Sequence, residues 1–194
     1  DEAVPFARQA REIDDTHNRR MFLANVLGEA GEIEEGLQLI RNDRLKRPND
    51  PYMLNTLGYF LISHTDRLEE GFRILYRANA MARNDPYIAD SLGWAYYQMG
   101  HMEDALRLIL LSRRELAPQK HWEIEHHLGD IYWHLDRQEA ARKAWQTALD
   151  EFPPFLVAEE LRDKIENGIE GGPPPTIPVP RVSLEEEQSQ QREL

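Results

Sequence analysis

The stretch "DSLGWAYYQMG", residues 90–100, places Gly93 inside a run that otherwise favours a helix. A glycine within a helix costs about 0.5–1 kcal/mol relative to alanine, so its presence needs a compensating reason. A close approach of two helix backbones is such a reason, because it leaves no room for a side chain. The stretch therefore predicts a helix that packs tightly against a neighbour at Gly93.

The small residue of this stretch recurs along the chain. Small residues preceded by leucine stand at positions 24, 58, 93 and 129, so the successive spacings are 34, 35 and 36 residues. A second small residue follows each of them, a bulky apolar residue lies four positions further on, and a proline punctuates each unit. Four units in phase predict stacked pairs of antiparallel helices, because one pair cannot bury its apolar face alone. The later positions are Gly36, Gly71, Ala105 and Ala141, then Ile40, Leu75, Ile109 and Trp145, then Pro48, Pro86, Pro118 and Pro153.

This pattern resembles the tetratricopeptide repeat (TPR), whose units carry W-x2-L-G-x2-Y, then A-x3-F and P. Residues 122–153 match it best. The first unit departs most, with a leucine in place of the tyrosine and Asp43 in place of the usual later alanine. The resemblance implies an all-α fold, a right-handed superhelical array of antiparallel helix pairs with a C-terminal capping helix. We expect four repeats within residues 17–153, at about 17–50, 51–85, 86–121 and 122–153.

The two ends of the chain extend this scheme. Residues 1–16 match the second helix of a preceding, truncated repeat, and a native N-terminal cap helix is the alternative. Residues 154–168 form the expected capping helix, which ends at Gly168. Residues 169–194 are rich in proline and acidic residues and predict an extended or disordered tail. Within it, "PPPTIPVP" suits either a polyproline ligand of another protein or a spacer.

Composition limits the function. The net charge of −12 disfavours binding to nucleic acid and leaves a basic partner open. The chain has no cysteine, which excludes disulfides, zinc–thiolate sites and thiol nucleophiles. No apolar run approaches the roughly 18 residues of a transmembrane helix.

In a TPR superhelix the first helix of each pair lines an inner groove. Large aromatic side chains with polar neighbours are common anchors of binding surfaces. Tyr96 and Tyr132 are expected in the core, whereas Trp94 and its neighbours either face the groove or pack between repeats. The predicted partner-binding residues are Tyr52, Asn55, Tyr59, Tyr87, Asp90, Trp94, Tyr97, His126, Asp130, Trp133 and His134.

Signatures of catalysis and of cofactor binding are not found in the sequence. His126, Asp130 and His134 share one helix face, but the outer two lie about 12 Å apart along a helix, too far to ligate one metal ion. No phosphate-binding loop, dinucleotide-binding or nucleophile-elbow motif is present. We therefore expect no enzyme activity, no cofactor and no metal.

Two functions remain. The first is a scaffold or adaptor whose groove binds a peptide, a helix or a partner enzyme; the second is a structural subunit that assembles through the flanks of the array and the tail. Segments such as "LNTLGYFLISHTDRL" and "HLGDIYWHLDRQEAARKAWQTAL" resemble the C-terminal repeats of long proteobacterial TPR proteins, one branch of which comprises envelope lipoprotein adaptors for proteases. The resemblance implies a periplasmic or envelope location and an envelope protease or complex subunit as partner, with a cytoplasmic location as the alternative.

Overall fold

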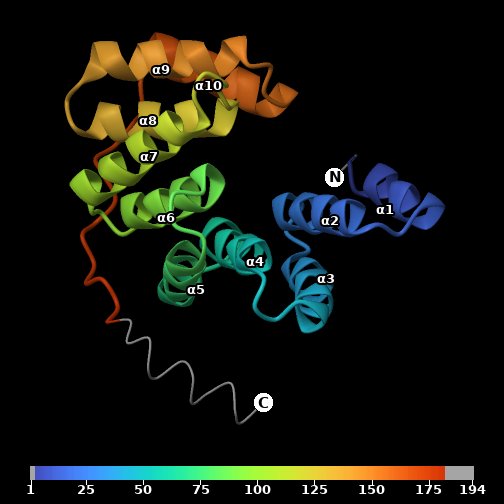
Figure 1. The fold of residues 1–194 in the computed structure, drawn as a ribbon. Helices are drawn as coiled ribbons and strands as arrows, with labels where there is room; N and C mark the ends of the chain where they lie inside the picture. The colour runs from blue at the N-terminus through green and yellow to red at the C-terminus, as the bar shows by residue number, and fades with distance from the viewer. Residues whose placement is uncertain (1–2, 182–194) are drawn as a thin grey trace. The chain divides into compact units, whose positions relative to one another are not determined.

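The computed structural model describes residues 3–181, and the described residues form ten helices and no strand (Figure 1). They divide into two compact units, residues 3–81 with 179–181, and residues 82–178. The rest of the expected tail, residues 182–194, lies outside the described residues. The first unit contains α1 (Ala3–Ile13), α2 (His17–Glu29), α3 (Ile33–Lys46), α4 (Pro51–His64) and α5 (Leu68–Met81). The second contains α6 (Pro86–Gln98), α7 (Met102–Leu116), α8 (Trp122–His134), α9 (Gln138–Asp150) and α10 (Phe155–Asn167).

Local sequence signals set the starts of the helices and the turns between them. The side chain of Asp50 accepts a hydrogen bond from the Tyr52 backbone at 2.9 Å at the start of α4, and Asp85 does the same for α6. Such caps satisfy backbone donors that the first helical turn leaves free. Gly31 and Gly100 occupy the turns within two helix pairs with φ of 80° and 76°, a region that favours glycine.

The recurring small residues lie where the two helices of each pair meet. A Cβ atom added to Gly58 would lie 2.6 Å from Leu75, and one added to Gly93 would lie 2.8 Å from Ile109. A Cβ at Gly129 would lie 2.2 Å from the indole of Trp145. In the first pair, Ala24 is fully buried and its carbonyl lies 3.0 Å from the position of a Cβ at Gly36. The predicted close approach of paired helices is therefore confirmed.

Asp43, which departs from the repeat pattern, is buried with its own ion pairs. His17 Nδ1 lies 2.7 Å from one carboxylate oxygen, and Arg20 Nε donates to the other at 2.8 Å. Burial raises the pKa of an aspartate, but the hydrogen bonds and positive charges of these partners prevail and hold the pKa of Asp43 below its ordinary value. The equivalent positions on α5 and α9 carry the fully buried Ala78 and Ala148, so the first pair replaces an apolar contact with a polar one.

The capping helix α10 packs on α9. Leu161 is fully buried in a cluster with Trp145, and Val157 and Ile165 pack against the same cluster. Tyr132 contacts this cluster and that of α6–α8, which Tyr96 also contacts. Residues 169–178, which belong to the second unit, then return along its helices to the turn between α6 and α7 (Figure 1). In the described part of the chain, no helix is both long enough and apolar enough to cross a membrane.

Candidate functional site

A stack of three rings joins α6 to α8. Trp94 lies nearly parallel to Tyr97, with ring centroids 4.5 Å apart, and nearly parallel to His127, at 4.1 Å. Two rings cannot share one indole face at these distances without overlapping each other, so Trp94 lies between them. Trp94 is partly buried and Tyr97 is only 7% exposed. Because both faces of the indole are covered within the unit, only its edge is left for a partner.

A buried ion pair holds the histidine of this stack. His127 Nδ1 lies 3.1 Å from each carboxylate oxygen of Asp90, and both side chains are buried. Burial acts to lower the pKa of the imidazole, but the charge of Asp90 and the hydrogen bond to it prevail, so the pKa of His127 lies above its ordinary value. Asp90, predicted to face a partner, is thus engaged with α8.

Asp130 lies at the centre of a second polar cluster, which joins α8 to α9 and α10. It accepts hydrogen bonds from Trp145 Nε1 at 2.9 Å and from Lys164 Nζ at 2.9 Å. Lys164 Nζ also lies 2.7 Å from His126 Nε2 and 2.6 Å from Glu160 Oε1. The predicted partner-binding groups of Asp130 and His126 are therefore in contact with the capping helix.

The same cluster keeps Glu160 ionised. The hydrogen bond with His126 lowers the pKa of Glu160 most, partial burial acts in the opposite direction, and Lys164 lowers it further, to about 2. The Glu160 side chain is half exposed. A carboxylate that stays charged into acid solution keeps the ammonium of Lys164 paired across that range.

Tyr97 and His134 form a third contact between α6 and α8. Tyr97 Oη lies 3.0 Å from His134 Nδ1. Burial raises the pKa of Tyr97 far above its ordinary value, and Asp130 acts in the same direction, so the phenol stays protonated. Burial also lowers the pKa of His134 by more than Asp130 raises it. Both pKa shifts are consistent with a hydrogen bond in which the protonated phenol of Tyr97 donates to the neutral imidazole of His134.

Trp133, another predicted groove residue, lies against the end of α10. Its Nε1 donates to the Ile169 carbonyl at 3.2 Å, and its ring lies so close to Gly168 that a Cβ there would overlap it. The Arg142 guanidinium lies 5.1 Å from the ring centroid, within the range of a cation–π interaction. The indole therefore holds the chain where the last helix ends.

The most exposed predicted residues are two tyrosines at equivalent positions. Tyr52 on α4 is 56% exposed and Tyr87 on α6 is 47% exposed, and each directly follows the proline that begins its helix. The Tyr87 ring meets His121 edge to face, with centroids 5.6 Å apart. Tyr59 and Asn55 on α4 are partly buried, and Asn55 Oδ1 meets no hydrogen-bond donor among residues 3–181.

Three residues that organise the site were not among those predicted from the sequence. His127 lies next to His126 in the sequence but faces Asp90. The sequence offers one indication of this pair, an acidic residue on α6 and a basic one on α8, the first helices of two successive repeats. Glu160 and Lys164 are four residues apart and share one face of α10. They were interpreted as part of a capping helix, because nothing in their spacing reveals the aspartate that Lys164 contacts.

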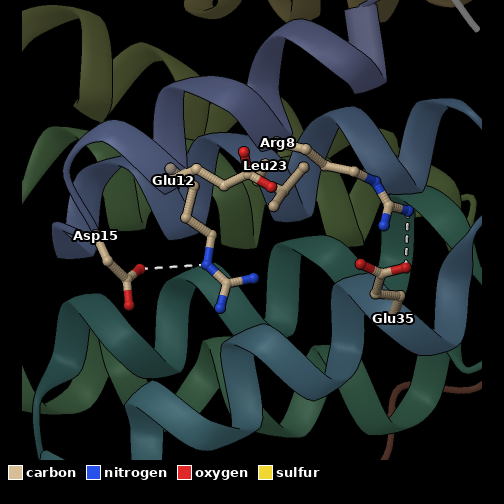
Figure 2. Close-up of a pocket in the computed structure, with 6 residues that line it drawn as sticks. Arg8, Glu12, Asp15, Leu23 and Glu35 are labelled. Atoms are coloured by element: carbon tan, nitrogen blue, oxygen red, sulfur yellow. Dashed lines mark hydrogen bonds and ion pairs between the residues drawn. The ribbon is translucent and has the colours of Figure 1, made fainter.

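A pocket of about 390 Å³ lies in the first unit, away from the predicted groove residues. It is lined by Arg8, Arg11 and Glu12 of α1, Asp15 of the following loop, Leu23 of α2 and Glu35 of α3. Arg8 lies 2.8 Å from a carboxylate oxygen of Glu35, and Arg11 lies 3.2 Å from one of Asp15. Figure 2 shows Arg8 directed toward Glu35. Because both arginines are paired with carboxylates, they do not offer the pocket an uncompensated positive charge that would select an anion.

The described residues contain no group of three or more histidine, aspartate or glutamate side chains placed to hold a metal ion. The histidines and carboxylates of the second unit instead contact one another, Lys164 and aromatic rings. Such an arrangement holds the helices of the second unit together.

These features define an all-α protein of antiparallel helix pairs with the TPR fold, as the sequence predicted. No protein-family model matches the sequence, and no curated protein matches it significantly. Among solved structures, it is similar to a thermophilic TPR protein of Thermus thermophilus, with 18% identity and a TM-score of 0.64 over 86% of this chain and 88% of that one.

Two further structures show the same fold. The Cut9–Hcn1 hetero-tetramer of the APC/C matches with 16% identity and a TM-score of 0.65, over 84% of this chain and 31% of that one. YrrB, described as a TPR protein with an unusual peptide-binding site, matches with 18% identity and a TM-score of 0.52, over 84% and 82% of the two chains.

Proposed function

We propose that the chain is a non-catalytic scaffold or adaptor that binds a protein or peptide partner through the first helices of its repeats. The observation that carries this proposal is the exposure of Tyr52 and Tyr87 at equivalent positions of two repeats. Tyrosine combines a large apolar ring with a hydrogen-bonding hydroxyl and has few rotatable bonds, which suits it to anchor a partner.

The surroundings of Tyr87 support this role. The ring contacts His121, and the stack of Trp94, Tyr97 and His127 ties α6, the helix that carries Tyr87, to α8. An exposed side chain on a rigid helix loses little freedom when a partner binds. Two structures of the same fold support a role in binding: one is the Cut9–Hcn1 hetero-tetramer, and the other, YrrB, is described as a TPR protein with an unusual peptide-binding site.

The test is a selection of random peptides with the full chain, followed by affinity measurements on two variants. Tyr87→Ala removes the proposed anchor, and Phe155→Ala removes another exposed ring of the same unit, which is 73% exposed on α10. We expect Tyr87→Ala to weaken the selected peptides about tenfold or more, as loss of an aromatic anchor does. Equal affinity for both variants and the unaltered chain would contradict an anchoring role for Tyr87.

A structural subunit is the second candidate, and one apolar patch favours it. Phe152, Phe155 and Leu156, at the α9–α10 junction, are 91%, 73% and 80% exposed. Exposed apolar groups this close together often mark a protein interface. Under this alternative, Phe155→Ala and not Tyr87→Ala disrupts assembly, so the same pair of variants separates the two functions.

A periplasmic or envelope location, with an envelope protease or complex subunit as partner, belongs to this proposal. Its support is the resemblance of the repeats to proteobacterial envelope proteins. Fractionation of cells that produce the full-length protein tests it, and recovery with the cytoplasmic markers would contradict it.

A further inference from the structure

The proline-rich segment after α10 makes specific contacts with the turn between α6 and α7. The backbone N–H of Ile177 donates to the Met99 carbonyl at 3.1 Å. The Ile177 carbonyl lies 2.7 Å from His101 Nε2, and since a carbonyl oxygen only accepts, Nε2 donates this bond. Ile177 thus has both of its backbone polar groups paired with one turn, the N–H with the Met99 backbone and the carbonyl with the His101 side chain.

Gly100, at the centre of that turn, allows the segment to approach. A Cβ on Gly100 would lie 2.7 Å from both the Pro174 carbonyl oxygen and Thr176 Cα. Gly31 has nearly the same φ in the corresponding turn of the first helix pair, and a Cβ there would meet nothing within 4 Å. The left-handed turn accounts for both glycines, whereas the contact with a second backbone is particular to Gly100.

The other end of the segment is also anchored. Trp133 donates to the Ile169 carbonyl and packs on Gly168, so the chain is fixed where it leaves α10. Between the two anchors lie Pro173, Pro174 and Pro175. Consecutive prolines hold a chain extended before it docks, which lowers the entropy lost on docking.

We propose that the α6–α7 turn is a docking site for an extended, proline-rich segment, and that its occupant is residues 173–177 of the same chain. The docked segment acts as a strap that ties the end of α10 to the α6–α7 pair. The site binds the backbone N–H and carbonyl of Ile177, and the segment can approach because residue 100 has no side chain. It is separate from the proposed anchor Tyr87, and it does not depend on whether that tyrosine binds a partner.

The test is amide hydrogen exchange of Ile177, followed by NMR in the full chain. Pro175 and Pro178, which flank Thr176 and Ile177, carry no N–H, so the amides of Thr176 and Ile177 report on the strap directly. We expect Ile177 in the unaltered chain to exchange at least about tenfold more slowly than in an unstructured peptide. Exchange at the unstructured rate would overturn the proposal.

Two substitutions test the site itself. Gly100→Ala should release the strap and remove the protection of Ile177, while Gly31→Ala introduces the same backbone strain and should leave that protection intact. Equal effects of both variants would assign the result to turn strain and overturn the proposal. His101→Phe keeps a ring beside Tyr96 but removes the donor to Ile177. Because Gly100 is unchanged in this variant, faster exchange of Ile177 would come from the lost hydrogen bond alone, and we expect it. An unchanged exchange rate would also overturn the proposal.

Discussion

Gly129 has the least space of the recurring small residues, and the reason lies in its neighbour. The Trp145 ring that a Cβ would meet at 2.2 Å is fully buried and donates a hydrogen bond to Asp130. It cannot move aside without losing that bond. At Gly58 the nearest atom is Leu75 Cγ, at 2.6 Å, and a leucine side chain has no hydrogen bond to lose when it shifts.

We expect Gly129→Ala to lower the free energy of unfolding by about 1–3 kcal/mol, as overpacking of a rigid core does, despite the better helix propensity of alanine. The measurement is urea denaturation followed by circular dichroism. Gly172→Ala is the control, since a Cβ at Gly172 meets nothing within 4 Å. A Gly129→Ala chain as stable as the control would show that α8 and α9 do not meet at this residue.

His127 gives a second prediction at the residue scale. Its pKa is raised in the folded chain, chiefly by Asp90 acting against burial, with Glu123 and Asp130 adding in the same direction. The stabilisation is therefore fully present below the unfolded pKa of about 6.5 and is lost as pH rises through the higher folded pKa. An NMR titration of the His127 ring should give a pKa above that of a free imidazole, and Asp90→Asn should lower it. A His127 pKa below about 6.5 in the unaltered chain would contradict the ion pair.

At the residue scale, the sequence predicts close backbone contacts but not the side-chain contacts around them. The positions of Gly58, Gly93 and Gly129 follow from their period, because a backbone contact repeated in each unit leaves a repeated small residue. The surroundings of Trp94 do not follow. Its register places it on one face of α6, but whether His127 of the next pair covers that face depends on side-chain contacts that no spacing encodes.

At the scale of elements, α10 combines two kinds of contact. Its apolar side is predictable from Val157, Leu161 and Ile165, which recur every four residues and pack toward α9. Its polar contact is not, because Lys164 resembles any exposed lysine in the sequence. In the structure the Lys164 side chain is only 14% exposed and pairs with Asp130.

We expect Lys164→Met to destabilise the second unit by about 3 kcal/mol, since removing one partner leaves the buried carboxylate of Asp130 poorly compensated. Thermal unfolding measured by circular dichroism provides the test, with Lys143→Met on the exposed surface of α9 as the control. If Lys164→Met and Lys143→Met have the same midpoint, the contact between Lys164 and Asp130 contributes nothing to the docking of α10.

At the scale of the whole molecule, the period of the repeats predicted which helices pair, because within each unit a helix contacts mainly the helices next to it in the sequence. The docking of the strap, residues 173–177, could not be predicted from the period, because it joins parts of the chain that are far apart. Its contacts join Ile177 to Met99, residues far apart in the chain that share no repeat position. A proline-rich sequence predicts an extended backbone and does not identify the surface on which that backbone docks.

The net charge of −12 supports a prediction for the chain as a whole. A surface with this excess of carboxylates repels phosphates and releases no counterions from DNA, whereas it attracts polycations in a salt-dependent way. At about 50 mM salt we expect no binding to a DNA duplex in a fluorescence anisotropy assay, and binding to polylysine that weakens as salt rises. DNA binding that weakens with salt would reveal a basic surface that outweighs the net charge, and polylysine binding insensitive to salt would show that contacts other than charge attract a basic partner.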